Sequence, residues 1–157
     1  MRQLKRQRGL TLIELMVAFA IASMLALAAT PFFADYGINS RLRESGNLLY
    51  GEALFAQSEA IKRNREVRVS TAGTGITVAE VTNAGTTNTL RARNVSDGVT
   101  LPTATVGFSS TGWPVDLAAH SIDLSHATNS CDNDYRCPGL RVEAGGAIRL
   151  CGNKTGC

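Results

Sequence analysis

The pattern of apolar and polar positions divides the chain into an apolar first part and a mixed remainder. From Leu10 to Ala34 the residues are almost all apolar, and Glu14 is the only charged one. A helix rises about 1.5 Å per residue, so this segment is long enough to cross a hydrocarbon core of roughly 30 Å. Four basic residues precede it: Arg2, Lys5, Arg6 and Arg8. Because basic flanks stay in the cytoplasm, the pattern predicts a single-pass membrane helix with the rest of the chain on the far side.

The carboxylate inside this apolar segment argues against two common alternatives. A secretory signal peptide also has basic residues before an apolar stretch, but its apolar core is shorter. A plain single-span anchor explains the length of the segment. Neither explains Glu14, because a charge within the bilayer is costly. A glutamate at this position therefore needs a specific reason.

The region after the apolar stretch reads as a continuation of the same helix. Between Tyr36 and Arg65, apolar residues recur every three or four positions with charged residues between them, which is typical of an amphipathic helix. They are Leu42, Leu48, Leu49, Leu54, Phe55, Ala56 and Ile61. Pro31 is expected to kink or loosen the helix locally, and Gly46 and Gly51 to weaken it slightly. The first half of the chain is thus predicted to be one long helix.

The second half of the chain is predicted to fold as an antiparallel sheet, because short β-type runs alternate with turn residues. The predicted strands are Glu66–Ser70, Gly75–Val81, Thr89–Ala92, Val99–Leu101, Thr105–Phe108, Ser121–Leu124, Leu140–Glu143 and Ala147–Cys151. The last two form a predicted hairpin, and residues 82–89 are predicted to be an exposed loop. We expect an α+β fold in which the sheet packs on the amphipathic half of the helix. Residues 1–9 would be a leader, 10–34 the membrane-spanning stem, and 35–157 a head that includes the C-terminal half of the helix.

The four cysteines lie within the last 27 residues: Cys131, Cys137, Cys151 and Cys157. An even number in loop-rich sequence behind a membrane segment predicts two disulfides in an oxidising compartment, with three pairings possible. A zinc site is the alternative, but the spacing contains no CxxC pair. His120 and His126 are the only histidines, which is too few for a metal site of histidines. We therefore predict a non-enzymatic head without metal or cofactor, whose C-terminal hairpin is stabilised by disulfides.

The run Arg8-Gly9-Leu10-Thr11-Leu12-Ile13-Glu14-Leu15 resembles the processing site of type IV prepilins and pseudopilins. The resemblance implies that a prepilin peptidase cuts between Gly9 and Leu10, that Leu10 is then N-methylated, and that Glu14 is the fifth mature residue. Leu10 departs from the more usual phenylalanine, whereas Pro31 lies where pilin helices often carry a proline. The amine of Leu10 on one subunit could then pair with Glu14 of a neighbour. In a low-dielectric bundle that ion pair would be much stronger than in water.

Three segments of the head narrow the resemblance. The helix end at residues 51–64 with strand Glu66–Ser70, the turn at 106–112 and the hairpin at 140–151 resemble the GspH/FimT family of H-type pseudopilins and T- and U-type minor pilins. The resemblance implies the type IV pilin fold and a periplasmic head on an inner-membrane stem. It implies a minor pilin that joins other minor pilins and the major pilin in the initiation or tip complex of a pilus, supporting motility, adhesion or DNA uptake. An H-type pseudopilin of a type II secretion system is the alternative.

Charge bears on whether the head binds DNA. The formal net charge is +3, but from Asp35 onward 12 basic residues are balanced by 12 acidic ones. The head therefore lacks a strong positive footprint. Some T-type relatives bind DNA through a Gly-Arg-x-Arg motif, of which Gly146 and Arg149 match here and Ala147 does not. Arg141, Arg149 and Lys154 are kept as candidate DNA contacts, and a DNA-binding tip pilin is a second hypothesis.

Overall fold

The computed structural model describes residues 11–82, 85–132 and 134–157, with the backbone alone at 29–32 and 34. It contains two compact units, Met1–Asp35 and Tyr36–Cys157, and each is described by itself. The predicted leader and cleavage site, which include Gly9 and Leu10, lie outside the described residues.

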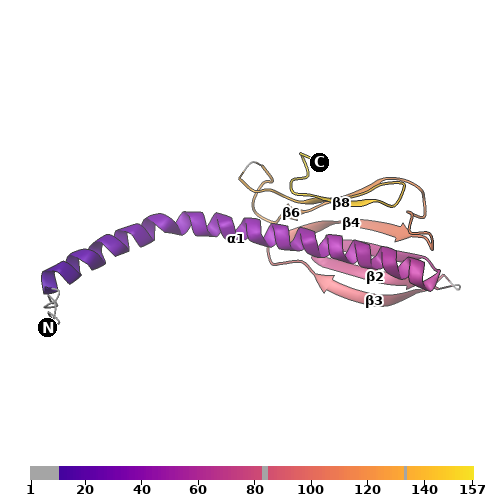
Figure 1. Ribbon diagram of the computed structural model, residues 1–157, viewed down its shortest axis with the longest axis horizontal. Coiled ribbons are helices and arrows are strands. Elements are labelled where there is room, and N and C mark those ends of the chain that lie inside the picture. Colours follow the sequence, from indigo (N-terminus) through magenta and orange to yellow (C-terminus); the bar gives the residue numbers. More distant parts are fainter. Residues whose placement is uncertain (1–10, 83–84, 133) are drawn as a thin grey trace, which may run out of the picture. The chain divides into compact units, whose positions relative to one another are not determined.

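A single long helix, α1, covers Leu12–Arg63 (Figure 1). The predicted continuous helix is confirmed, although it ends two residues before Arg65. It ends there because Asn64 adopts a left-handed conformation with φ of 53°, a common way for a helix to terminate. The Arg65 N–H also reaches back to the Ala60 carbonyl at 3.2 Å. Pro31 lies within α1, but its side chain is outside the described part of the chain, so the kink stays a prediction.

The strands of the head form two sheets (Figure 1). In chain order the strands are β1 (Val67–Gly73), β2 (Gly75–Val81), β3 (Thr87–Asn94), β4 (Val99–Phe108), β5 (His120–Asp123), β6 (Ser125–His126), β7 (Gly139–Val142) and β8 (Ile148–Cys151). The first sheet has the order β3-β2-β1-β4-β6 and the second the order β5-β7-β8. Every pairing of these strands is antiparallel. The antiparallel head is confirmed, with its strands divided between two sheets rather than gathered in one.

Strand β4 corrects one prediction, because Val99–Leu101 and Thr105–Phe108 belong to one strand rather than two. Pro102 lies between these segments and has no N–H to donate to a sheet, and prolines of this kind are found at strand irregularities. Here the pairing of β1 with β4 is irregular after Thr71, and the Thr71 hydroxyl donates to the Pro102 carbonyl at 2.7 Å. Strand β3 also begins earlier than predicted, at Thr87, and takes in part of the predicted loop.

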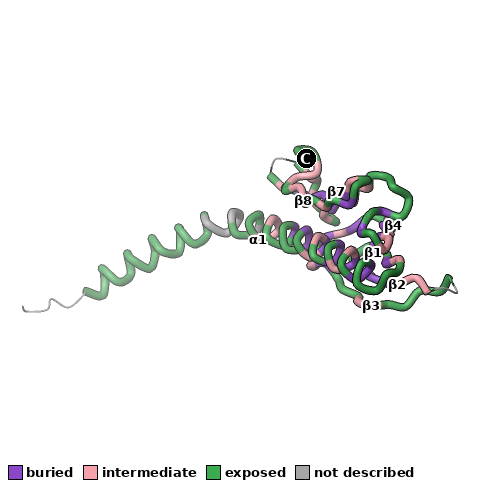
Figure 2. The backbone as a smooth tube through the Cα atoms, turned by 45° about the vertical axis from the view of Figure 1, so that its right-hand side comes forward, coloured by how far each residue is buried: buried purple, intermediate pink, exposed green. Residues whose placement is uncertain are grey.

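The core of the head lies between the second half of α1 and the strands (Figure 2). The most buried apolar residues of the helix are Leu42, Leu49, Ala53, Ala56 and Ala60, each at most 1% exposed. Spacings of three, four and seven residues place them on one face of the helix. Three of the five are alanines. The same hydrophobic cluster includes the buried strand residues Val69, Val78 and Phe108.

Two disulfides constrain the C-terminal part of the head. Cys131 is bonded to Cys137 ahead of β7, and Cys151 at the end of β8 is bonded to Cys157. Of the three pairings that the sequence leaves open, the structure has the one that joins nearest neighbours. Each bridge closes a short loop beside the terminal hairpin, as expected for a hairpin stabilised by disulfides.

Candidate functional site

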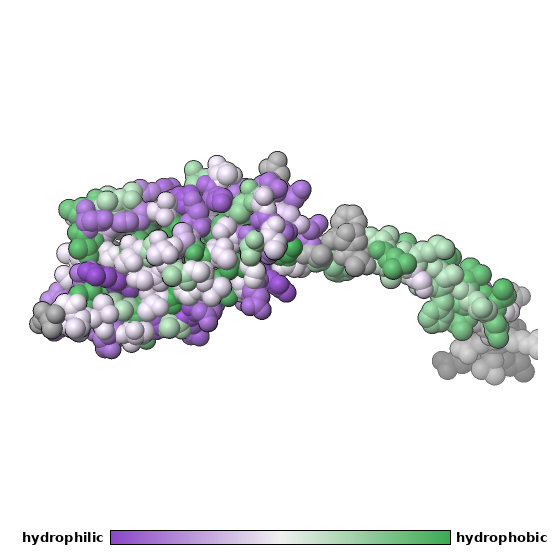
Figure 3. Space-filling model, turned by 180° about the vertical axis from the view of Figure 1, so that it is seen from behind, coloured by the Kyte–Doolittle hydropathy of each residue, from purple (hydrophilic) through white to green (hydrophobic). Residues whose placement is uncertain are grey.

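The described part of the stem exposes its apolar side chains (Figure 3). Every side chain from residue 11 to residue 28 is exposed, including Leu12 at 77%, Phe19 at 67% and Leu27 at 76%. Apolar surface of this extent marks a contact surface, because single soluble chains rarely leave so much of it uncovered.

Among the described residues, no helix combines the length and the apolar character that crossing a membrane requires.

Glu14 forms the N-terminal cap of α1 together with Thr11. The Glu14 N–H donates to the Thr11 hydroxyl at 3.3 Å, and the Glu14 carboxylate accepts hydrogen bonds from the Thr11 N–H and hydroxyl, both at 3.4 Å. This reciprocal arrangement is a capping box, which satisfies N–H groups left free at a helix start. The carboxylate is therefore held at the first turn of the helix. This cap was not predicted from the sequence, although the Thr-x-x-Glu spacing is the pattern typical of it.

Two of the three candidate DNA contacts, Arg141 and Arg149, have acidic or carbonyl partners. Arg141, with a side chain only 21% exposed, donates to the Asp123 carboxylate at 2.5 Å and to the Lys154 carbonyl at 3.2 Å. Arg149 forms an ion pair with Glu143. These partners reduce the positive charge that a phosphate backbone would meet. DNA contact through Arg141, Arg149 and Lys154 stays a prediction, and the ion pairs of the two arginines do not favour it.

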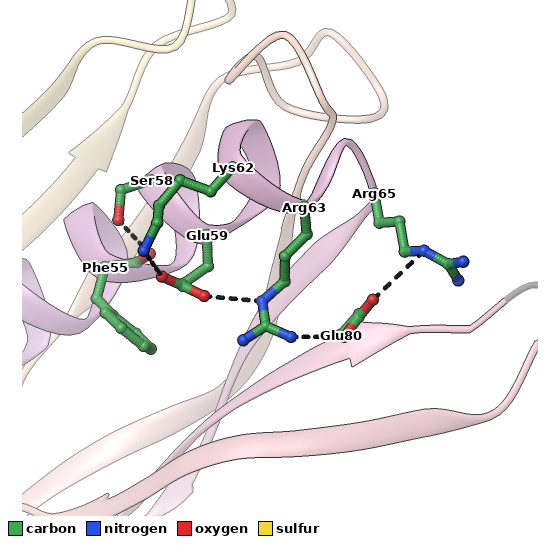
Figure 4. Close-up of polar contacts among 7 residues, drawn as sticks. All are labelled: Phe55, Ser58, Glu59, Lys62, Arg63, Arg65 and Glu80. Carbon is green, nitrogen blue, oxygen red and sulfur yellow. Dashed lines mark hydrogen bonds and ion pairs between the residues drawn. The ribbon is translucent and has the colours of Figure 1, made fainter.

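A network of ion pairs surrounds the C-terminal end of α1 (Figure 4). Glu59, only 7% exposed, accepts hydrogen bonds from Lys62 at 2.8 Å and from Arg63 at 2.7 Å. Glu80 of β2 lies 3.1 Å from Arg63 and 3.5 Å from Arg65. The hydrogen bonds from Lys62 and Arg63 hold the pKa of Glu59 below its usual value. The basic residues at this end of the helix thus contact carboxylates rather than forming an open positive patch.

Replacing Glu59 with glutamine is expected to make the stability of the head less sensitive to acid. The pKa of Glu59 is lower in the folded than in the unfolded state. Its ionised form therefore stabilises the fold when the pH is above the pKa of the unfolded state. That contribution is lost as the pH falls through the pKa of the folded state. Below about pH 4, the urea midpoint of the wild type should therefore fall more steeply than that of Glu59→Gln.

Asp97→Asn is the matched control for this measurement. Asp97 is exposed and takes part in none of the ion pairs found among the described residues. Its variant should keep the acid sensitivity of the wild type. Identical slopes for wild type and Glu59→Gln would show that the Glu59 contacts add nothing to folding.

A buried glutamate that the sequence pattern alone did not indicate connects α1 to the edge strand β3. Glu52 is 4% exposed, and its Oε1 lies 3.3 Å from Arg91 and 4.0 Å from Arg93. The Arg91 guanidinium also lies over the Phe55 ring, 3.7 Å from its centroid. The second carboxylate oxygen, Oε2, is buried without a hydrogen-bond partner in the described structure. Glu52 and Glu59 are seven residues apart, which places both on one edge of the buried helix face.

The two histidines make local contacts in different sheets. His120, on β5, lies 2.9 Å from the Asp116 carboxylate. His126, on β6, accepts a hydrogen bond from the Thr128 N–H at 3.4 Å. In the described ranges, no group of three or more histidine, cysteine or acidic residues is arranged to hold a metal ion.

Four exposed apolar residues, named together the apolar patch, belong to the last turn of α1 and to the segment after β4: Ile61, Trp113, Val115 and Leu117. Each of these residues is at least 50% exposed. The turn that carries Trp113 packs closely on the helix, since a Cβ added to Gly112 would lie 2.9 Å from the Ile61 side chain. The Gln57 amide of α1 also donates to the Gly112 carbonyl at 2.8 Å. The turn at Gly112 is therefore held on the helix, while the four side chains are exposed to solvent.

Comparison with known protein families gives two matches. Residues 4–30 match the prokaryotic N-terminal methylation motif. Residues 45–155 match the family described as type II transport protein GspH. The second match covers more than half of the chain, including the second part of α1 and all the strands.

Individual relatives agree with these matches. Fimbrial protein EcpC of Eikenella corrodens is 46% identical over 46 residues, which are 29% of this chain and only 30% of that protein. The type IV minor pilin FimU of Pseudomonas aeruginosa has a TM-score of 0.60 at 17% identity, over 71% of this chain and 88% of that structure. The minor pseudopilin EpsH from the type 2 secretion system of Vibrio cholerae has a TM-score of 0.58 at 14% identity, over 71% of this chain and 96% of that structure. At these identities the two structures establish a common fold.

Proposed function

This chain belongs to the GspH family of type II transport proteins, and on that premise we propose that it is a non-catalytic minor pilin or pseudopilin, working in the initiation or tip complex of a type IV pilus. One observation carries the proposal. A methylation motif at residues 4–30 is joined, through the unbroken helix α1, to a head with its own hydrophobic core. Such a chain has one part suited to helix packing and another suited to display outside the membrane.

In this proposal the stem is prepared for assembly by processing. A prepilin peptidase removes residues 1–9, and the new N-terminal residue, Leu10, is methylated. The apolar stem holds the protein in the inner membrane with its head in the periplasm until other pilin stems surround it. An unpaired carboxylate is costly in such surroundings, so Glu14 pairs with the amine of Leu10 on a neighbouring subunit and sets the register between stems.

The heads then make a second set of contacts. The apolar patch of Ile61, Trp113, Val115 and Leu117 is exposed on the isolated head, and covering it with another pilin head would remove apolar surface from water. FimU and EpsH share the fold while serving a pilus and a secretion system. The fold therefore supports both machines, and a pseudopilin of a type II secretion system is the second candidate.

A deletion strain separates these candidates. Removing the gene is expected to abolish twitching motility and surface pili, leave type II secretion intact, and be complemented by the wild-type chain. Loss of secretion with normal motility would instead assign the chain to the secretion system.

Mass spectrometry of the mature protein is expected to show a methylated N-terminus at Leu10. An intact leader on the assembled protein would refute the proposal.

A further inference from the structure

A cavity of about 800 Å³ in the head lies between the first turns of the head's helix and two C-terminal loops. Its walls include Asn39 and Arg43 of α1, Arg136 from the first disulfide loop and Gly152 after β8. Asn39 fixes the disulfide loop to the helix: its Nδ2 donates to the Asp134 carbonyl at 2.8 Å, and its Oδ1 accepts the Arg136 N–H at 3.1 Å. The cavity is therefore a built feature of the fold.

Two of the head's four basic side chains that have no ion-pair partner among the described residues line this cavity, and the other two are Arg41 and Lys154. Of the ten arginines from residue 41 onward, seven form ion pairs with carboxylates. Arg41, Arg43 and Arg136 have no ion-pair partner within the described ranges, and two of these three line the cavity. Asp134 is the acidic residue in the lining, but its carboxylate is not within ion-pair distance of either arginine. Two guanidinium groups thus face a polar cavity without a counter-charge in contact with them.

The helix residues that line the cavity follow the apolar segment closely in the sequence, which indicates the kind of anion that the cavity binds. Arg43 follows the last residue of the apolar stretch, Ala34, by nine positions. The aromatic residues Phe33 and Tyr36 at that boundary are 73% and 75% exposed, and exposed aromatic residues at the end of an apolar segment are typical of the headgroup level of a membrane. Arginine is well suited to phosphate because its fork of N–H groups can bind two oxygens at once.

We propose that this cavity binds the phosphate of an anionic phospholipid headgroup while the subunit resides in the membrane, with Arg43 and Arg136 as the phosphate contacts. The inference rests on the proposed function, since it requires the stem to be inserted in lipid. It assigns to the head a role before assembly: the bound headgroup holds the base of the head against the membrane surface. Packing among other stems then withdraws the subunit from that lipid.

Native mass spectrometry of the detergent-solubilised full chain, mixed with equal amounts of phosphatidylglycerol and phosphatidylcholine, tests this proposal. The wild type is expected to retain more phosphatidylglycerol than phosphatidylcholine. The double variant Arg43→Gln/Arg136→Gln should lose this preference by about 25-fold, because each arginine near an anionic surface contributes about fivefold. The control is Arg68→Gln/Arg93→Gln, which removes the same charge from side chains 45% and 59% exposed elsewhere on the head. That control should retain phosphatidylglycerol as the wild type does.

Three outcomes would overturn the proposal. Equal retention by the cavity variant and the control would show that binding follows net charge alone. Binding of inorganic phosphate at Arg43 and Arg136, without retained phosphatidylglycerol, would assign the cavity to free phosphate. The cavity variant could also lose its cross-links to another pilin while its lipid retention stays unchanged. That result would assign the cavity to a carboxylate of a partner protein. The mass of the same sample shows whether residues 1–9 have been removed, so failure of the proposed processing is detected separately.

Discussion

Replacing Glu14 with alanine is expected to leave the protein in the membrane while lowering its incorporation into pili or initiation complexes roughly tenfold to hundredfold, because a hydrogen bond to a charged group contributes about 1.5–3 kcal/mol. Insertion depends on the apolar residues around Glu14 and is made easier when the charge is removed. Assembly depends on the carboxylate, because the amine of Leu10 on a neighbouring subunit would lose its partner. Immunoblots of membrane fractions and of sheared pili measure the two steps separately.

The capping box gives a competing explanation, and matched variants distinguish it. Glu14 and Thr11 bond each other at the start of α1, so alanine at position 14 also weakens the helix cap. Glutamine can take the glutamate's place in a capping box but carries no charge. We expect Glu14→Gln to assemble as poorly as Glu14→Ala, and Thr11→Ala to assemble nearly as well as the wild type. Normal assembly of Glu14→Gln would mean that the cap, rather than the charge, is what assembly needs.

Helix α1 could be predicted from the sequence because its signals are local. The apolar residues of the stem are consecutive, and Leu42, Leu49 and Ala56 repeat at the spacing that keeps them on one side of a helix. Glu14 could be singled out for a similar reason, since a lone charge within an apolar run is visible without any knowledge of tertiary structure. A sequence pattern is most informative about features that depend on residues close to one another in the sequence.

The features that could not be predicted depend on residues far apart in the chain. Pro102 lies in β4 where the pairing with β1 is irregular, and its carbonyl accepts a hydrogen bond from the Thr71 hydroxyl, 31 positions away. The division into two sheets likewise depends on which strand edges meet. The cavity is fixed by Asn39 and Arg136, which are 97 positions apart. A sequence pattern contains no information on such a contact, so only the fold shows that Arg43 and Arg136 have no ion-pair partner in the part of the chain that the structure describes.

The same substitution at two glycines of α1 is expected to have opposite effects on the stability of the head. Gly51→Ala should stabilise it by about 0.5–1 kcal/mol, because alanine is the better helix former and a Cβ at position 51 has no other atom within 4 Å. At Gly46 a Cβ would lie 2.7 Å from the Cβ of Pro138 and 3.5 Å from Leu150. Overpacking of this kind usually costs about 1–3 kcal/mol, so Gly46→Ala should destabilise the head despite its helix propensity. Urea unfolding of the two variants beside the wild type measures both effects.

The size of the Gly46 effect depends on how firmly Pro138 is held. The Pro138 carbonyl accepts the Leu124 N–H at 2.9 Å, and the preceding residue, Cys137, is bonded to Cys131, so the proline ring has little freedom to move away from the helix. In a Cys131→Ser/Cys137→Ser background the loop can yield, and the cost of Gly46→Ala should become smaller there. The effect of Gly51→Ala should be the same in both backgrounds, because position 51 contacts neither loop. If Gly46→Ala proves as stabilising as Gly51→Ala in the wild-type background, the close packing of α1 against Pro138 is not a property of the folded protein.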